Sequence, residues 1–196
     1  MVILIAGVGY AGKTLMAQKL LEKYKYPYLS MDHIKMGLYR SNIDYGFTPE
    51  SDDDIIIGKL WPIIKGIIMT NIENGQNIII EGCYFPNSIN ELPKEYLNKI
   101  IFFSMLFTEK YCRKYFMDKI IKNRDAIEKR GYEFENSNNF LEKYILENKT
   151  KKKICKINGI KYFEIDENYD NEINTIYKWI EEKIIEIDNG VRPYFV

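Results

Sequence analysis

The sequence is poor in the residue types that most metal and disulfide sites use. Its 196 residues include a single histidine, His33, and three cysteines at scattered positions. An odd number of cysteines without metal-ligand spacing argues against a disulfide framework and against a cysteine-ligated metal, so we expect a reducing compartment. One histidine specifies little about a catalytic site. Arginine is also scarce among many lysines, so each arginine is worth locating individually.

Net charge and long apolar segments are lacking as well. The 28 basic and 28 acidic residues cancel, so no overall field attracts nucleic acid or an anionic membrane. The basic run Lys149–Lys153 is better explained as a solvated helix end than as a nucleic-acid patch. The first apolar run meets a glycine loop at once, which leaves no room for a signal peptide. Later runs such as Ile100–Phe107 are shorter than the roughly 20 residues of a membrane span. We predict a soluble, cytoplasmic protein that binds neither nucleic acid nor membrane, and the oligomeric state stays open.

What the sequence does contain is a regular alternation of short apolar runs and longer helical patterns, which is typical of an α/β fold with a parallel sheet covered by helices. The runs are continuously apolar, so both faces of the sheet should be buried. The five predicted parallel strands are Val2–Ala6, Pro27–Ser30, Asn77–Glu81, Lys99–Phe107 and Lys161–Ile165.

Helical periodicity places helices between and after these strands. A capping box of Ser51 and Asp54 is expected to open one long helix that ends near Gly75, with a kink at Pro62. The other predicted helices are Lys13–Tyr24, Glu109–Arg130, Asn139–Lys153 and Asn171–Ile187. We predict one domain over residues 1–196, with a lid segment at about 120–140 around the polar stretch Gly131–Asn138.

The strongest motif is the octapeptide Gly7-Val-Gly-Tyr-Ala-Gly-Lys-Thr14, which follows a predicted strand and precedes a predicted helix. This is the Walker A pattern in its required context; the alternative is a chance glycine turn. Glycines let backbone N–H groups surround phosphate oxygens, and the helix N-terminus adds partial positive charge. Lys13 would reach the β- and γ-phosphates of ATP, and the Thr14 hydroxyl would ligate Mg²⁺. The predicted nucleotide-binding residues are Gly7, Gly9, Tyr10, Ala11, Gly12, Lys13, Thr14 and Leu15.

Two carboxylates follow predicted strands. Glu81 ends an apolar strand, as a Walker B carboxylate does, and could hold Mg²⁺ directly or through water; the alternative is that it faces solvent. Asp32 follows the second strand, where a general base could accept the proton of an attacking hydroxyl; the alternative is an ordinary helix N-cap. If the second strand ends beside the glycine loop, the Asp32 carboxylate would face the γ-phosphate.

Arginine is the side chain best suited to neutralise a transferring phosphoryl group, because its planar fork contacts two oxygens. Arg124 and Arg130 lie closest to the expected lid turn and are the preferred catalytic pair. Arg40 is a candidate for binding an acidic acceptor, and the acceptor pocket is expected to draw on Asp32, Arg40 and Tyr84. The alternative for each arginine is a solvated surface position.

The order of these motifs resembles the nucleoside and nucleotide kinase-like branch of the P-loop proteins, which includes adenylate, shikimate and gluconate kinases, chloramphenicol phosphotransferase and zeta toxins. Segments 28–40, 61–65 and 80–84 are similar to bacterial proteins labelled adenylate kinase or 2-phosphoglycerate kinase. The resemblance implies a three-layer P-loop NTPase fold with strand order 2-3-1-4-5, ATP on the glycine loop, an acceptor near Asp32 and a lid role for the Arg124 region. We expect adenine contacts near Asp166–Tyr169.

One departure from adenylate kinases bears on the acceptor. Those enzymes carry Asp-Gly-Phe-Pro-Arg after the third strand, whereas Glu81-Gly-Cys-Tyr-Phe-Pro86 has no arginine following, which argues against AMP.

The sequence therefore predicts a Mg-ATP-dependent kinase acting on a small-molecule hydroxyl or phosphate compound. A nucleotide or nucleoside kinase is the nearest alternative. A second alternative is an ATP-binding regulatory protein without an acceptor. GTP is disfavoured because the only similar string to the guanine-reading element, Asn148-Lys-Thr-Lys151, lacks its aspartate. A third is an interaction module with a vestigial loop.

Overall fold

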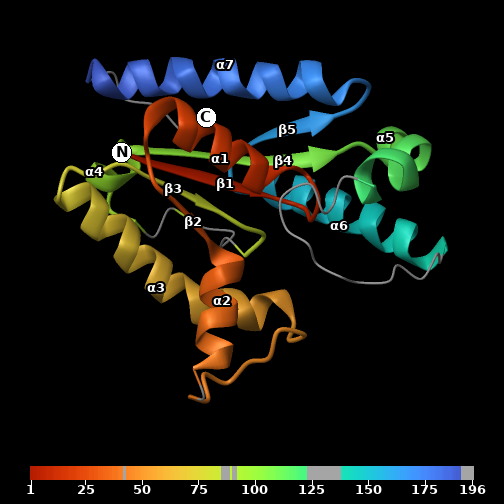
Figure 1. The fold of residues 1–196 in the computed structure, drawn as a ribbon, viewed down its shortest axis with the longest axis horizontal. Coiled ribbons are helices and arrows are strands. Elements are labelled where there is room, and N and C mark those ends of the chain that lie inside the picture. Colours follow the sequence, from red (N-terminus) through yellow and green to blue (C-terminus); the bar gives the residue numbers. More distant parts are fainter. Residues whose placement is uncertain (42, 85–88, 90–91, 123–137, 191–196) are drawn as a thin grey trace.

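A five-stranded parallel sheet forms the centre of the molecule (Figure 1). The computed structural model describes residues 1–41, 43–84, 89, 92–122 and 138–190. The strands lie in the order β2-β3-β1-β4-β5, and every neighbouring pair is parallel. This confirms the predicted sheet, and each strand limit agrees with the prediction to within one residue. The strands are β1 (Val2–Gly7), β2 (Tyr28–Ser30), β3 (Ile78–Glu81), β4 (Ile100–Phe107) and β5 (Lys161–Ile165).

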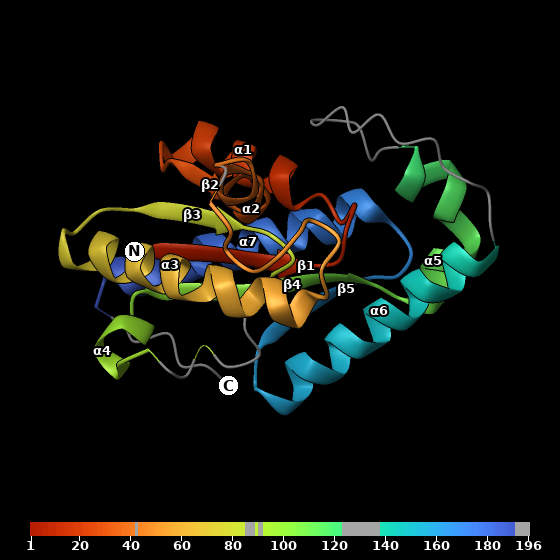
Figure 2. The same cartoon turned by 90° about the horizontal axis from the view of Figure 1, so that it is seen from below.

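Helices cover both faces of this sheet and give three layers (Figures 1 and 2). Helices α1 and α7 lie on one face, and α3 lies on the other. Helices α5 and α6 stand near the ends towards which β4 and β5 point. The helical elements are α1 (Lys13–Tyr24), α2 (Met31–Arg40), α3 (Asp53–Glu73), α4 (Lys94–Leu97), α5 (Glu109–Tyr115), a π-helical turn η2 (Phe116–Ile121), α6 (Asn138–Ile157) and α7 (Tyr169–Asp188).

The core consists of two clusters, one on each face of the sheet. Alternate residues of β1 point to opposite faces: Ile3 and Ile5 join the cluster under α1 and α7, whereas Val2 and Leu4 join the cluster under α3. This is the period-two geometry of a strand. Because both clusters are apolar, the β1 run needs no polar positions, as the sequence indicated.

Helix α3 is long and apolar enough to cross a membrane by length and composition, and it is the one such helix in the described part of the chain. In the structure it instead packs Leu60, Ile64 and Ile68 into the core against the sheet, where each is fully buried. One side of α3 therefore belongs to the core of the fold. The cytoplasmic location stays a prediction.

The expected capping box at the start of α3 is wrong. The N-cap is Asp52, whose side chain makes no cap hydrogen bond. The Ser51 hydroxyl instead accepts a hydrogen bond of 2.9 Å from the N–H of Thr48, so it closes a local turn before the helix begins. Helix α3 also continues as one element through Pro62.

The predicted helix Glu109–Arg130 differs from the structure. It ends as α5 at Tyr115 and is followed by the π-helical turn, which reaches Ile121. Most of the predicted lid, including residues 123–137, lies outside the described residues. The short helix α4 was not expected, because four residues are too few to show helical periodicity.

Candidate functional site

The glycine-rich segment 7–14 lies at the carboxyl end of β1 and leads directly into α1. Its first residue, Gly7, has φ +141°, and an added Cβ would stand 2.2 Å from the carbonyl oxygen of Met105 on β4. Its last glycine, Gly12, is the N-cap of α1 with φ +86°. Both positions need glycine, because L side chains rarely adopt these angles and the strands approach closely. The chain is thereby turned so that the N-terminus of α1, with its unbonded N–H groups, borders the loop.

Lys13, in the first turn of α1, is buried, and its ammonium donates a hydrogen bond of 2.7 Å to the carbonyl oxygen of Val8 across the loop. Burial by itself lowers the pKa of Lys13. Attraction to the Cys83 sulfur and to the Glu81 and Asp32 carboxylates outweighs burial, so the pKa is raised. Lys13 therefore stays protonated and offers a positive charge where three sequence-distant segments converge.

Two tyrosines from distant helices hold the outer side of the loop. The hydroxyl of Tyr144 on α6 donates to the carbonyl oxygen of Gly9 at 2.5 Å. The hydroxyl of Tyr169 on α7 donates to the carbonyl oxygen of Ala11 at 3.2 Å. Burial raises the pKa of Tyr169 to about 12 and that of Tyr144 well above its ordinary value, so both hydroxyls keep their protons. Two loop carbonyls are therefore fixed by groups outside the loop.

Glu81 ends β3 and is almost fully buried. Its backbone is in register with Ile5 of β1 and Ser30 of β2, its two neighbouring strands. The alternative that Glu81 faces solvent at the strand end is therefore wrong. The carboxylate instead lies within electrostatic reach of Lys13.

Asp32 lies in the first turn of α2, one residue inside the helix, and the N-cap is Ser30. The interpretation of Asp32 as a plain cap is therefore wrong. Its carboxylate pairs with the ammonium of Lys35 at 3.1 Å. That ammonium also donates to the hydroxyl of Tyr84 at 2.7 Å. The structure thus brings Asp32 and Tyr84 together through Lys35, a buried residue that the sequence analysis did not single out.

The remaining predicted site residues are not all in this cluster. Arg40 is exposed in the last turn of α2, about 12 Å along the helix axis from Asp32 at 1.5 Å per residue. Thr14 and Leu15 lie half-buried in the first turn of α1, beside Lys13. Arg124 and Arg130 lie outside the described residues.

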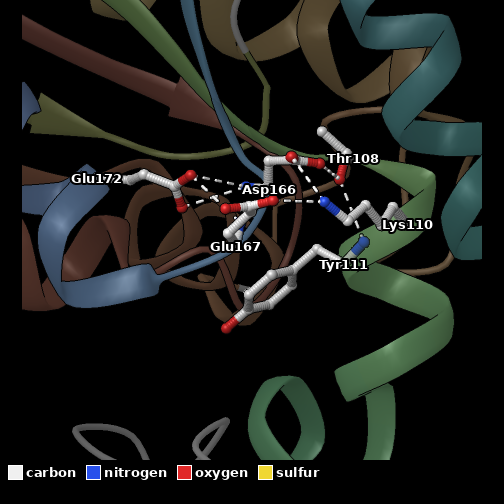
Figure 3. A network of polar contacts seen from close by, with 6 residues as sticks. All are labelled: Thr108, Lys110, Tyr111, Asp166, Glu167 and Glu172. Atoms are coloured by element: carbon white, nitrogen blue, oxygen red, sulfur yellow. Dashed lines mark hydrogen bonds and ion pairs between the residues drawn. The ribbon is translucent and has the colours of Figure 1, made fainter.

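A polar network joins the two chain segments that follow β4 and β5 (Figure 3). The Thr108 hydroxyl donates to Asp166 at 2.7 Å and also accepts the N–H of Tyr111 as the N-cap of α5. The Glu172 carboxylate accepts the N–H of Asp166 at 3.1 Å. Lys110 adds ion pairs with Asp166 and Glu167. The network therefore fixes the start of segment 166–169, where we expect the adenine contacts.

A cavity of about 440 Å³ lies on the α3 face of the sheet, bordered by α3, α6, β1 and β4. We call it the α3–α6 cavity. Gly7 and Cys83 line it, so it adjoins the segment that starts the glycine loop. No sequence signal indicated it, because its walls come from residues up to about 150 positions apart.

Comparisons with known proteins show that the fold is similar to that of solved structures, but they do not assign the chain to a family. No family model matches the chain. No curated protein matches it either. A crystal structure described as a putative kinase from Chloroflexus aurantiacus J-10-fl is 15% identical, with a TM-score of 0.52 over 94% of this chain and 96% of that one. An uncharacterized protein from Eubacterium ventriosum ATCC 27560 is 16% identical, with a TM-score of 0.46 over 93% of this chain and 98% of that one. At these identities the first likeness shows the fold alone, which is compatible with a P-loop-like architecture.

Sequence reasoning missed three residues that the geometry brings to the site: Lys35, Tyr144 and Lys151, whose ammonium donates to the Cys83 carbonyl oxygen at 3.3 Å. Lys35 was detectable in principle, since it lies three residues after Asp32 and this spacing pairs side chains on a helix. No local signal pointed to these contacts of Tyr144 and Lys151, because their partners, Gly9 and Cys83, are distant in the sequence.

Proposed function

We propose that this chain is a P-loop kinase, which transfers the γ-phosphoryl group of Mg-ATP to a small-molecule acceptor. The observation that carries the proposal is the environment of Lys13: a buried, protonated ammonium on a glycine loop at a helix N-terminus, with Glu81 and Asp32 within electrostatic reach. A cation on a glycine loop at a helix N-terminus is the arrangement that binds phosphate groups. The kinase description of one structural neighbour agrees with the proposal.

The residues present fit ATP and Mg²⁺. In the part of the chain that the structure describes, no three His, Cys, Asp or Glu side chains gather as a metal site. Magnesium binds through one or two protein ligands plus phosphate oxygens and water. Thr14 and Glu81 would supply those protein ligands, and bound Mg²⁺ would neutralise the phosphates. Segment 166–169 would border the adenine.

In the transfer step, the hydroxyl oxygen of the acceptor would bond to the γ-phosphorus of ATP, and Asp32 would accept the proton of that hydroxyl. The bond between the γ-phosphorus and the bridging oxygen would break, which releases ADP. Lys35 orients Asp32 and holds Tyr84 beside it. Lys13 would stabilise the charge on the transferring group. The predicted lid arginines Arg124 and Arg130 would complete this stabilisation.

The test is ADP release from Mg-ATP across a panel of nucleotides, nucleosides, glycerates, sugars and amino alcohols, with Lys13→Ala alongside wild type. We expect acceptor-dependent release that the substitution reduces by at least about a hundredfold, because the reaction loses a preorganised positive charge. Lys19→Ala is the matched control, since Lys19 lies on the same helix and is exposed. Turnover by Lys13→Ala close to that of Lys19→Ala would refute the proposal.

A further inference from the structure

The α3–α6 cavity is placed where an acceptor would meet the glycine loop. Gly7 and Cys83, at the ends of β1 and β3, line it. Glu147 of α6 also lines it and lies within electrostatic reach of Lys13. One end of the cavity is therefore beside the group that would hold the transferring phosphoryl.

The cavity walls away from the glycine loop are apolar. Ile57 from α3, Phe102 from β4 and Ile154 from α6 contribute to its walls, and Ile160 follows α6. A cavity of this size and lining suits the body of a small molecule, because apolar area removed from water is the main source of affinity in such pockets.

The end beside the loop is charged, with more acid than base. Lys151 shares its ammonium between Glu147 at 3.7 Å and Asp53 at 4.0 Å, and donates to the Cys83 carbonyl. Two carboxylates thus compete for one ammonium. The pKa of Glu147 is raised, mainly by burial and also by repulsion from Asp53. Attraction to Lys151 and Lys13 lowers this pKa but does not outweigh burial. Asp54 and Lys143 also line the cavity, so the described part of the chain contributes three acids and two bases to its lining.

This charge pattern selects the chemical class of the acceptor. A phosphorylated or carboxylated acceptor would meet a lining in which, among the residues that the structure describes, acids outnumber bases. An ammonium, by contrast, would be attracted to Glu147 and Asp53, which share the single ammonium of Lys151. The hydroxyl to be phosphorylated must lie at this same end, because Lys13 does.

From these observations we infer that the α3–α6 cavity binds an amino alcohol with an apolar body: the body lies against Ile57, Phe102 and Ile154, and the amine lies on Glu147 and Asp53. The inference rests on the proposed function for the direction of phosphoryl transfer, and the binding itself requires no turnover. It narrows the acceptor from any small hydroxyl or phosphate compound to a cationic, amphipathic alcohol.

The experiment is calorimetric titration of the full chain with three probes, with and without saturating Mg-ADP. The probes are 2-amino-1-phenylethanol, 1-phenylethanol, which lacks the amine, and phenyl phosphate, which carries an anion. With Mg-ADP occupying the glycine loop, we expect the amino alcohol to bind most tightly and phenyl phosphate least. In Glu147→Gln the amino alcohol should lose about tenfold or more in affinity, the size of a lost charge-assisted hydrogen bond, while 1-phenylethanol is unchanged.

Steric variants test the location. Ile154→Phe fills the cavity and should weaken both alcohols, whereas Ile157→Phe, on an exposed position of the same helix, should weaken neither. Glu147→Gln adds no volume, so it decides the question if Ile154→Phe is poorly folded. Tighter binding of phenyl phosphate, equal affinities in wild type and Glu147→Gln, or no binding of any probe in either condition would overturn the inference.

Mg-ATP affinity, measured on the same preparations, separates the two proposals. If the probes do not bind as expected but Mg-ATP binds and Lys13→Ala weakens that binding, the amino alcohol inference is rejected and the kinase proposal stands. Probe binding without ATP binding would reject the kinase and leave the cavity as a ligand site.

Discussion

The two sides of the candidate site are built differently. On the glycine-loop side, carbonyl oxygens are held by Tyr144 and Tyr169, and Asn148 accepts the N–H of Phe107 in the interior at 2.7 Å. On the α2 side, the helix buries only Met31 and Lys35. The loop side is thus fixed by the core of the fold, while the α2 side is attached through few side chains.

This difference agrees with the different tasks that the proposed function gives to the two sides of the site. A phosphate cradle must have its N–H groups in place before the anion arrives, so it gains from rigid supports. A proposed base and the lysine that orients it can rest on a less buried element, because its side chains can change without disturbing the sheet. The following variants would break or sharpen the comparison.

The largest effect on the loop side is expected from Gly7→Ala. Its Cβ would collide with the Met105 carbonyl oxygen, at a φ that disfavours L residues, and we expect a loss of about 3 kcal/mol in unfolding free energy. The corresponding fall in melting temperature is roughly 6–12 °C. Gly9→Ala is the matched control, because its Cβ would meet nothing within 4 Å. Equal melting temperatures for the two variants would show that the loop is not held as described.

On the α2 side, Asp32→Asn should affect turnover and leave the fold intact. We expect kcat to fall by about 10² to 10⁴, because the base is lost while ATP binding is spared. Asp188→Asn, at an exposed position of α7, serves as the control. The measurement is steady-state kinetics with an active acceptor, with the ATP dissociation constant determined separately. An unchanged kcat would remove Asp32 from the chemistry.

A smaller effect should follow from Tyr144→Phe, which keeps the ring and removes the hydroxyl that holds Gly9. One neutral hydrogen bond corresponds to roughly a threefold to tenfold loss of ATP affinity if the loop loosens. Equilibrium titration of Mg-ATP measures this, and Tyr39→Phe, which is exposed, is the comparison. Wild-type affinity in Tyr144→Phe would mean that the loop is fixed without this support.

The smallest effect concerns pH. The folded-state pKa of Glu147 is raised above its ordinary value of 4.5, chiefly by burial. A raised acid contributes stability that is present below the unfolded pKa and lost as pH rises through the folded pKa. Melting temperature should therefore decline less with rising pH, from 4.5 upwards, in Glu147→Gln than in wild type. Parallel curves would indicate that Lys151 already neutralises the carboxylate in full.

Much of the fold was predictable because its signals are local. Continuous apolar runs such as Val2–Ala6 indicated strands buried on both faces, and the structure confirms all five strands. The capping box at Ser51 failed because a hydroxyl before a helix can bond to several nearby N–H groups, and here it bonds to Thr48. The helix from Glu109 was predicted too long because its periodicity does not reveal a π-helical turn at Phe116–Ile121.

The candidate site divides in the same way. The roles of Lys13, Thr14, Glu81 and Asp32 were inferred from their places after strands, and the structure brings Glu81 and Asp32 within electrostatic reach of Lys13. Their chemical roles stay predictions. The hydrogen bond between Lys35 and Tyr84 joins α2 to the segment that follows β3, so it depends on tertiary packing that no short segment encodes.

The sequence by itself determined the sheet and the glycine-rich turn into α1, because apolar periodicity and the conformational freedom of glycine act over a few neighbouring residues. Only the tertiary structure decided which side chains support that turn and what the α3–α6 cavity offers. Tyr144, Glu147 and Lys151 lie more than 130 residues from the loop, and they meet it because β4 and β5 bring α6 beside β1. Side-chain convergence of this kind follows from packing across the whole fold.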